Sequence, residues 1–185
     1  MSSQTPVAVP SEARSQAVHI RCPSGVDGAS VWSLIAETPA LDGNSLYCNL
    51  LQCTHFAETC AVAESEGEVV GWLSAYVPPG QPDTLFVWQV CVAESARGQG
   101  LAQRLLTAVL QRPGSAAIRF IQSTITADNG PSWALFEKVA RVLDAPLQRQ
   151  PHFDREVHFG GTHATEHLVT IGPFAPEALG QATAA

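Results

Sequence analysis

Basic side chains are scarce in this sequence. Its 185 residues hold 10 Lys and Arg against 17 Asp and Glu, which gives a formal net charge of -7. Proteins bind the phosphate backbone of nucleic acids through clustered Lys and Arg, so a DNA or RNA partner is disfavoured. An acidic surface would suit a cationic small substrate, but it is also the ordinary surface of a soluble domain. The charge therefore disfavours nucleic acids as partners, but it does not indicate which other partner the protein has.

Long apolar runs and paired cysteine motifs are also missing. Arg, Gln, Asp or Pro interrupts every candidate for the stretch of roughly 20 apolar residues that crosses a bilayer. Residues 1–10 lack the basic start and the apolar centre of a secretory signal. The five cysteines show no C-x-x-C spacing and have apolar neighbours, as Cys91 has in Val90 and Val92. We expect reduced thiols, a cytoplasmic protein and no membrane contact.

The distribution of apolar residues predicts a single domain. With 45% hydrophobic residues, the chain is long enough to bury one substantial core. Residues 1–17 are rich in Ser, Pro, Gln and Ala, which predicts a flexible tail, and residues 175–185 have a similar composition. No repeat or second block of composition lies between the tails, so residues 18–174 are expected to form the domain.

Hydrophobic periodicity and turn residues predict the order β-α-α-β-β-β-α-β-α-β-β. The expected strands are 18–22, 59–64, 68–77, 84–93, 118–125, 153–159 and 166–171, and the expected helices follow Ser24 and Ser45 and cover 101–110 and 133–143. The turn Ser65-Glu66-Gly67 joins an antiparallel pair, and the Val-, Phe- and Trp-rich run 84–93 should be the central strand. This order predicts an α+β fold with α/β/α layers, in which helices flank a mixed central sheet.

Two glycines separate the central strand from the next helix, in Arg97-Gly98-Gln99-Gly100. Backbone amides at a helix N-terminus, unobstructed by Cβ atoms, form an anion site that suits a pyrophosphate. A dinucleotide loop would need Gly or Ala where Gln103 stands, and no Gly-Lys-Ser/Thr of a P-loop occurs in the chain. A phosphorylated cofactor is therefore indicated, although a purely structural turn would use the same glycines.

The loop and a later helix resemble the GNAT superfamily of N-acetyltransferases. The Arg97–Ala102 stretch matches the acetyl-coenzyme A loop, usually written Q/R-x-x-G-x-G/A, and Asn129, Ser132, Leu135 and Phe136 match Asn-x-x-Ala-x-x-Leu-Tyr. The resemblance implies the GNAT fold and acetyl-CoA as co-substrate. It implies these cofactor-binding residues: Val90, Val92, Arg97, Gly98, Gln99, Gly100, Leu101, Ala102, Asn129 and Ser132. Phe136 departs from the family because it cannot protonate the leaving thiolate, as the usual Tyr does.

Longer blocks resemble one GNAT family in particular, the L-2,4-diaminobutyrate acetyltransferases of ectoine biosynthesis. These blocks are residues 41–47 and 82–90, with His55-Phe56 and 160–163, and the likeness spans about residues 19–173. It implies acetylation of the 4-amino group by direct attack in a ternary complex, and a homodimer with the late hairpin or a sheet edge as its contact. A GNAT enzyme for another diamine, an amino acid or a protein N-terminus stays open, as does a non-catalytic acyl-CoA sensor.

The same resemblance suggests the acceptor site. Asp42 can attract an ammonium group, Tyr47 can hydrogen-bond, and Thr84 and Trp88 complete the substrate-binding set. Without the resemblance, Asp42 would be a turn or helix-start residue. The central strand has Trp88 where GNAT enzymes often place a Glu, so the general base is sought in Asp42 or His163, although a lone His is more often structural. Asp42, Trp88 and His163 are the catalytic candidates.

No metal is expected. His163 and His167 are four residues apart, but the region alternates like a strand and offers neither a thiolate nor a third ligand. Direct transfer also leaves Cys91 without a catalytic role, since no acetyl-enzyme is formed.

Overall fold

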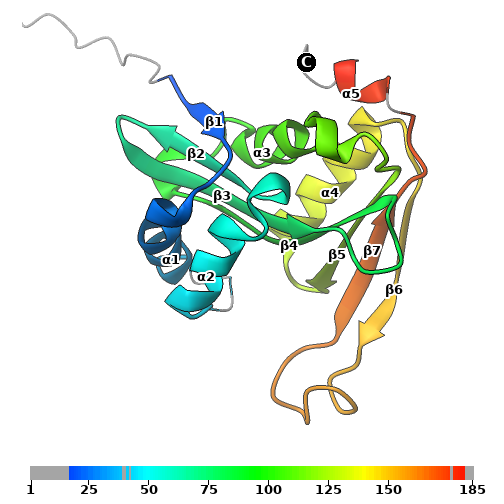
Figure 1. The fold of residues 1–185 in the computed structure, drawn as a ribbon. Helices are drawn as coiled ribbons and strands as arrows, with labels where there is room; N and C mark the ends of the chain where they lie inside the picture. The colour runs from blue at the N-terminus through cyan, green and yellow to red at the C-terminus, as the bar shows by residue number, and fades with distance from the viewer. Residues whose placement is uncertain (1–16, 39–40, 42, 176, 182–185) are drawn as a thin grey trace, which may run out of the picture.

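The computed structural model describes residues 17–38, 41, 43–175 and 177–181, and its centre is a seven-stranded sheet in the order β1-β2-β3-β4-β5-β7-β6 (Figure 1). Only β4 and β5 are parallel, and every other neighbouring pair is antiparallel. The strands are β1 (His19–Arg21), β2 (Ala61–Ser65), β3 (Glu68–Tyr76), β4 (Thr84–Val92), β5 (Phe120–Thr126), β6 (Leu147–Phe153) and β7 (Glu166–Ile171). The predicted mixed sheet is confirmed.

Helices cover both faces of the sheet. The α-helices are α1 (Gly28–Ala36), α2 (Leu46–Thr54), α3 (Leu101–Leu110), α4 (Gly130–Val142) and α5 (Ala178–Gln181). Short 3₁₀ turns are η1 (Gly25–Asp27), η2 (Ala57–Thr59), η3 (Glu94–Ala96) and η4 (Pro113–Ser115). Figure 1 shows α1 and α2 on one face and α3 and α4 on the other. The α+β fold with layered helices is therefore confirmed.

Each face of the sheet has its own apolar core. The larger core packs α3 and α4 on the central strands, and Leu105, Leu106 and Ile121 are among its fully buried members. The smaller core lies under α1, where Val31 and Trp72 are buried completely. The helical spacing of Leu101, Leu105 and Leu106 puts them on one side of α3, and all three are buried in the larger core.

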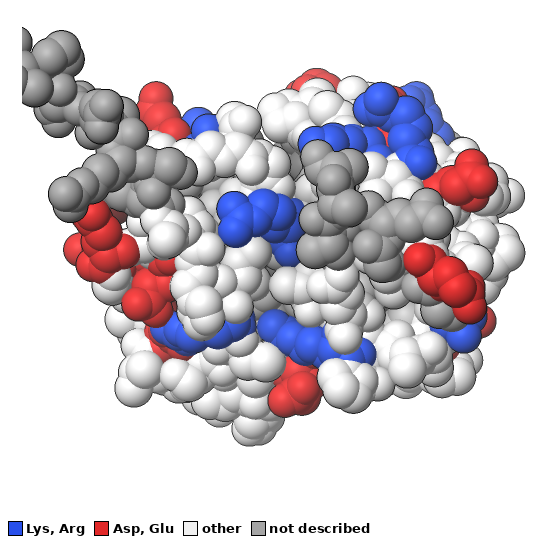
Figure 2. Space-filling view, turned by 90° about the horizontal axis from the view of Figure 1, so that it is seen from above, with Lys and Arg blue, Asp and Glu red and all other residues white. Residues whose placement is uncertain are grey.

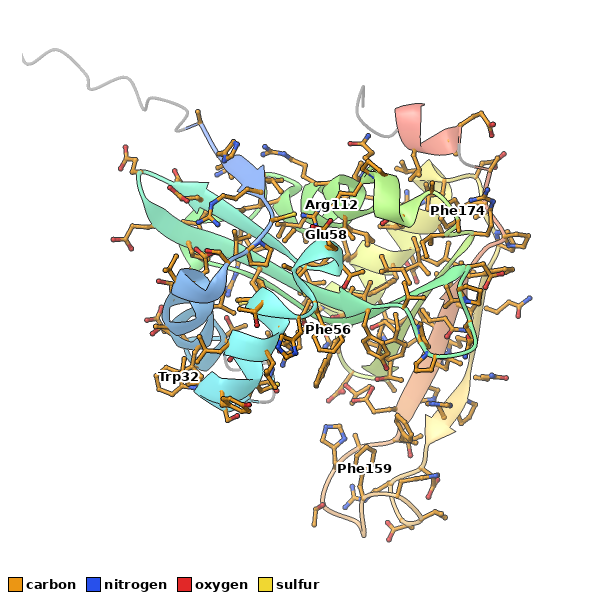
Figure 3. The ribbon with its side chains drawn as sticks, in the orientation of Figure 1. Trp32, Phe56, Glu58, Arg112, Phe159 and Phe174 are labelled. Atoms are coloured by element: carbon orange, nitrogen blue, oxygen red, sulfur yellow. The ribbon has the colours of Figure 1, made fainter. Side chains whose placement is uncertain are left out.

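Two polar clamps fix the segments that surround the sheet. Arg21 forms a bidentate pair with Asp27 and also contacts Glu64, which ties β1, η1 and β2 together. Nη1 of Arg112 donates to the carbonyls of Ala57, Glu58 and Cys60 at 3.1, 2.7 and 2.7 Å. Arg112 and Glu58 are labelled in Figure 3. The second clamp holds the chain that leaves α2 against the far end of α3.

The predicted strand at 153–159 is wrong. The strand that pairs with β7 is β6 (Leu147–Phe153), and residues 154–165 form a loop with turns. Oδ1 of Asp154 accepts the amides of Glu156 and Val157, which bends the chain immediately after the strand. β6 lies at the edge of the sheet and is mostly exposed. It therefore lacks the alternation of buried and exposed residues on which sequence prediction depends.

The C-terminal region also differs from the expected flexible tail. Helix α5 lies within it, and Ala178 and Leu179 pack against the larger core. Nε2 of Gln111, which follows α3, donates to the backbone carbonyl of Leu179 at 3.3 Å. A four-residue helix has too few residues to show a periodicity in the sequence.

Candidate active site

The central feature of the site is the separation of β4 from β5. The two strands pair only where Thr84–Phe86 faces Phe120–Gln122, and no later pair joins them. Just beyond the last pair, Oγ of Ser123 donates to the carbonyl of Val87 at 2.9 Å. From there the strands diverge, which leaves one edge of β4 open beside the N-terminal part of α4.

A β-bulge in the same strand changes the direction of Trp88. Val87 pairs with Ala75 and Gln89 pairs with Ser74, so Trp88 has no partner on β3. A bulge lets two consecutive side chains reach the same face of a sheet. Trp88 lies edge-on to the ring of Tyr76, with centroids 6.4 Å apart, and Oε1 of Gln89 accepts from Asn44 at 2.6 Å. The bulge thus places an indole and an amide side by side.

The glycine loop has the backbone that its sequence requires. Gly98 and Gly100 have φ angles of 77° and 68°, in the left-handed region that disfavours residues with a Cβ. A Cβ at either position would meet nothing within 4 Å, so the loop faces open space. Gly100 is the N-cap of α3, where the unpaired amides and the helix dipole favour an anion.

Most of the predicted cofactor residues lie around one cavity of about 470 Å³. It is lined by Val90, Val92, Arg97, Gly98, Gly100, Leu101, Ala102 and Ser132, together with residues of α4 such as Leu135 and Lys138. Gln99 lines an adjoining hollow of about 630 Å³ with Arg104 and Lys138. On the face seen in Figure 2, Lys and Arg side chains occupy the centre and acidic side chains lie mainly towards the edges.

A second cavity, of about 260 Å³, fills the gap between β4, β5 and α4. It shares Val90, Ser132 and Leu135 with the cavity at the glycine loop, so the two cavities adjoin. Its walls include Trp88, Gln89, Asn129 and Phe136. Asn129 caps α4 by accepting the amide of Ser132 at 3.2 Å.

Two ionisable side chains enter this inner cavity from the chain around the start of β7. His163 and Glu166 both line it, and Nε2 of His163 lies 3.9 Å from Oε1 of Glu166. Nδ1 of His163 is 2.8 Å from the carbonyl of Ala164. The ring centroids of His163 and Phe159 are 4.6 Å apart, and Phe159 is labelled in Figure 3. Sequence reasoning found His163 and missed Glu166. The sequence marks Glu166 only as an acidic residue three positions after His163, at the first residue of a strand.

A third cavity, of about 600 Å³, lies on the α2 side of the sheet. Trp88 and Thr124 line both this cavity and the inner one, so the two adjoin. Its lining residues come from α2, β3 to β7 and the loop after β3; they are Gln52, Phe56, Ser74, Ala75, Tyr76, Pro78, Gln81, Phe86, Trp88, Gln122, Thr124, His152, Phe153 and Leu168. Sequence reasoning missed the polar members of this set, because they come from strands and helices far apart in the chain.

Tyr47 and Thr84, two other residues named from the sequence for the acceptor, lie away from these cavities. Asp42 lies outside the described residues. Tyr47 is on α2 with 69% of its surface exposed, whereas Thr84 is 4% exposed at the start of β4 and its hydroxyl contacts Asp83. Neither Tyr47 nor Thr84 is among the described residues that line the inner cavity or the cavity on the α2 side. Of the four residues named for substrate binding, Trp88 lines both cavities.

Phe136 and Cys91, the residues on which a side-chain acid or a thiol nucleophile would depend, are both buried. Phe136 is 2% exposed and presents a ring without a hydroxyl to the inner cavity. Burial raises the pKa of the Cys91 thiol, which contacts the hydroxyl of Thr38 and the carbonyl of Leu34. A thiol of this kind stays protonated at neutral pH and is a poor nucleophile.

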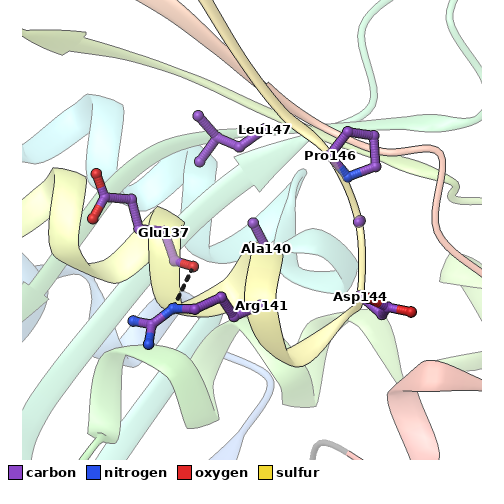
Figure 4. Close-up of a pocket in the computed structure, with 7 residues that line it drawn as sticks. Glu137, Ala140, Arg141, Asp144, Pro146 and Leu147 are labelled. Atoms are coloured by element: carbon purple, nitrogen blue, oxygen red, sulfur yellow. Dashed lines mark hydrogen bonds between the residues drawn. The ribbon is translucent and has the colours of Figure 1, made fainter.

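A further hollow lies between α4 and β6, away from these residues (Figure 4). It is lined by Glu137, Ala140, Arg141, Asp144, Ala145, Pro146 and Leu147. Nε of Arg141 donates to the carbonyl of Glu137 at 3.3 Å. None of its lining residues was singled out from the sequence.

Over the described parts of the chain, no helix has the length and apolar character needed to cross a membrane. Within the same parts, no three His, Cys, Asp or Glu side chains gather as metal ligands would.

Comparison with known proteins identifies the family. The model of the acetyltransferase (GNAT) family matches residues 31–140. The L-2,4-diaminobutyric acid acetyltransferase of Methylotuvimicrobium alcaliphilum is 52% identical over 152 residues, which cover 82% of this chain and 88% of that protein. Its counterpart in Chromohalobacter salexigens is 48% identical over 161 residues, which cover 86% and 83%.

A solved structure gives the same result. It is diaminobutyrate acetyltransferase EctA from Paenibacillus lautus, in complex with its substrate L-2,4-diaminobutyric acid and coenzyme A. It matches with a TM-score of 0.83 and 41% identity, covering 86% of this chain and 97% of that chain. The resemblance found in the sequence is therefore confirmed, and the chain belongs to the GNAT family and, within it, to the L-2,4-diaminobutyric acid acetyltransferases.

Proposed function

We propose that the protein transfers the acetyl group of acetyl-CoA to the 4-amino group of L-2,4-diaminobutyrate, a step of ectoine biosynthesis. The observation that carries this proposal is that the cavity at the glycine loop adjoins the cavity of Trp88, His163 and Glu166 along the open edge of β4, so that the two can serve as one passage. An extended thioester and a small amine can meet only where such a passage joins an acceptor cavity.

The residues around the passage fit acetyl-CoA. Amides of the loop from Gly98 to Ala102 bind the pyrophosphate at the start of α3, with Arg97 and Lys138 nearby to balance its charge. The open edge of β4 at Val90 and Val92 takes the pantetheine arm as a sheet takes an added strand. The backbone amide near Val90 then polarises the thioester carbonyl.

The acceptor amine must lose a proton before or during attack. Glu166 is placed to accept it, since its carboxylate lines the inner cavity beside Trp88. Nδ1 of His163 donates to the carbonyl of Ala164, which leaves a lone pair on Nε2, 3.9 Å from Oε1 of Glu166. Because 31% of the His163 side chain is exposed, this ring passes the proton on towards solvent.

Attack is direct, in a ternary complex. Cys91 is too buried and too weakly ionised to carry the acetyl group. Phe136 cannot protonate the departing thiolate, so this proton comes from another donor, such as solvent or the nitrogen of the tetrahedral intermediate, which must lose a proton to become the amide. Asp42, which the sequence suggests for attracting an ammonium group of the acceptor, remains part of the proposal.

The first experiment measures free-thiol release from acetyl-CoA with L-2,4-diaminobutyrate, ornithine, lysine and a peptide, followed by NMR location of the acetyl group. We expect fast release with diaminobutyrate and acetylation at its 4-amino group. Turnover only on another amine would overturn the acceptor and keep acetyl transfer. Tight acetyl-CoA binding without turnover on any amine would favour the sensor, the reading that the missing hydroxyl at Phe136 supports.

The proposed base is tested by Glu166→Gln. We expect kcat to fall about 100-fold or more, with acetyl-CoA affinity unchanged, because general-base catalysis contributes at least this factor. The matched control is Glu156→Gln, in the loop before β7, where the carboxylate is 75% exposed and pairs with Arg155. A Glu166→Gln variant with the wild-type kcat would assign the base elsewhere.

We also propose a cytoplasmic homodimer. The sequence features above support the compartment. The hairpin of β6 and β7 extends beyond the layered body, and Phe153 and Val157 are 39% and 80% exposed at its end (Figure 1). Exposed apolar side chains gathered on one projection favour a protein contact. Light scattering should give twice the mass of the chain, and a monomeric mass at micromolar concentration would contradict the proposal.

A further inference from the structure

The first turn of α4 forms a wall shared by the inner cavity and the cavity at the glycine loop. Ser132 lines both cavities, and Pro131 lines the one at the glycine loop. The buried residues of this helix, which are Phe136, Val139 and Ala140, all lie beyond the first turn. The core therefore fixes the middle of α4, and the position of its first turn depends on other contacts.

The indole of Trp133 supplies such a contact. Its Nε1 donates to the backbone carbonyl of Thr126, the last residue of β5, at 3.0 Å, and its ring packs against the larger core. The same carbonyl accepts the amide of Asn129, the N-cap of α4, at 3.2 Å. Thr126 and Asn129 both line the inner cavity. The bond from Trp133 thus ties the first turn of α4 to the end of β5, where that strand no longer pairs with β4.

A cation from a third element lies over this indole. Cζ of Arg149 is 5.0 Å from the centroid of the Trp133 ring. Arg149 is on the edge strand β6, and β7 separates that strand from β5 in the sheet. A guanidinium over an indole is attracted by the negative face of the ring. Because this attraction favours one orientation of the ring, it also favours the orientation in which the indole N–H meets Thr126.

Neither side chain touches the space that the cofactor would occupy. Trp133 and Arg149 are not among the described residues that line the two cavities, so they can act on the cofactor only through the wall that they hold. A turn that is not held samples positions in which the cofactor does not fit, and affinity falls with the fraction of molecules in the fitting position. Once the cofactor is bound, it orders the turn itself.

We propose that Trp133 and Arg149 are positioning residues for acetyl-CoA, which act through the first turn of α4. The inference rests on the proposed function, because it assigns the two cavities to this cofactor. The indole N–H sets where the turn lies against the end of β5, and the guanidinium keeps the indole in the bonding orientation. Their contribution is to cofactor affinity, and neither residue takes part in proton transfer.

The first measurement is the Kd of acetyl-CoA by isothermal titration calorimetry, with the full-length wild type and Trp133→Phe. Phenylalanine keeps a ring under Arg149 and loses the N–H, so the Kd should rise about 5-fold. Ser115→Ala is the matched control, because it also removes a bond from a side chain to a backbone carbonyl, that of Val109 at 2.8 Å. Neither Ser115 nor Val109 lines the two cavities, so this variant should keep the wild-type Kd.

Turnover separates affinity from chemistry. With saturating acetyl-CoA and diaminobutyrate, the kcat of Trp133→Phe should stay within about 3-fold of the wild type, because the bound cofactor orders the turn. Hydrogen exchange over residues 127–136 should be faster in the variant without cofactor and equal to the wild type with cofactor bound. A kcat that falls as much as the affinity would assign Trp133 to the chemical step and overturn the inference.

Arg149 is tested by Arg149→Met, which keeps an apolar side chain and removes the cation. The Kd should rise about 3-fold, the amount expected for an exposed cation–π contact. Arg141→Met controls for the lost charge, since Arg141 is an exposed cation on α4 that lines neither cavity. When Trp133→Phe and Arg149→Met are combined, the Kd should be no higher than in Trp133→Phe alone, because the orientation of a ring without an N–H no longer matters.

The outcomes separate this inference from the proposed function. A wild type that does not bind acetyl-CoA would overturn both. A wild type that binds it, with Trp133→Phe binding as tightly as Ser115→Ala, would overturn the inference and leave acetyl transfer intact. Effects of the two substitutions that multiply in the double variant would contradict the role of Arg149. Thermal unfolding identifies any variant that has lost its fold, and if Trp133→Phe has, the exposed Arg149 and its control provide the test.

Discussion

The hydroxyl of Ser123 donates to the backbone carbonyl of Val87 at 2.9 Å, one residue beyond the last pair that joins β4 to β5. A side chain there takes the place of the next ladder hydrogen bond. The strands can therefore part without leaving this carbonyl unsatisfied in a buried position. The inner cavity lies next to this bond, since Ser123 and Val87 both line it.

Replacing Ser123 with Ala tests this arrangement. We expect a loss of about 1 kcal/mol in the free energy of unfolding, and a several-fold higher KM for acetyl-CoA because the passage loses a fixed wall. Ser115→Ala is the control, since Ser115 makes the same kind of buried bond, to the carbonyl of Val109 at 2.8 Å, away from the site. Denaturant unfolding and steady-state kinetics measure both. Equal KM values for the two variants would contradict the role of Ser123.

Gly100→Ala should weaken acetyl-CoA binding about 10- to 100-fold, measured by calorimetry. The φ angle of 68° strains any residue with a Cβ, and the added methyl group projects where the pyrophosphate approaches. Gly67→Ala controls for the strain alone, because Gly67 has a φ angle of 84° in the β2–β3 turn and equally open surroundings. Both variants should lose about 1 kcal/mol of stability. Only Gly100→Ala should lose affinity, and a similar loss in both would refute the pyrophosphate site.

Cys91→Ser should keep kcat within about 3-fold of the wild type, because the thiol is not the nucleophile. Burial raises the pKa of Cys91, so it is protonated at neutral pH and does not attack a thioester. The serine hydroxyl can keep the contacts with Thr38 and Leu34. Turnover is measured with acetyl-CoA and diaminobutyrate, and a loss of several orders of magnitude would point to an acetyl-cysteine.

Asp27→Asn should lower the free energy of unfolding by about 1–2 kcal/mol at pH 7. The bidentate bond from Arg21 holds the pKa of Asp27 below its usual value, with help from the amide and hydroxyl of Ser24. A carboxylate with a depressed pKa stabilises the fold above the unfolded-state value of about 4. This contribution is lost as the pH falls through the lower pKa of the folded state.

Urea unfolding of Asp27→Asn and wild type should therefore differ at pH 7 and converge in acid, as the pH falls through the lowered pKa of Asp27 in the folded state. The control is Glu64→Gln, which removes the other partner of Arg21. Its carboxylate is 34% exposed, so the loss should be under about 1 kcal/mol. A difference for Asp27→Asn that does not depend on pH would contradict the ion pair as its source.

Local signals determined much of this protein from the sequence alone. Helix α3 follows the spacing of Leu101, Leu105 and Leu106, and the β2–β3 hairpin follows the turn at Glu66 and Gly67, with φ angles of 53° and 84°. The glycine loop predicted an anion site from backbone geometry that only a few residue types tolerate. Each of these features depends on residues within a few positions of one another, so each has a pattern that can be read along the chain.

The acceptor site was decided by the tertiary structure. Glu166 shares the inner cavity with Trp88, and Gln52 shares the cavity on the α2 side with Ser74, although the members of each pair are far apart in the chain. Trp88 points into both cavities because the bulge offsets β4 by one residue, while Thr84, at the other end of that strand, is buried away from them. Strand register, bulges and the separation of paired strands are set by packing between distant segments, and no periodicity within one segment records them.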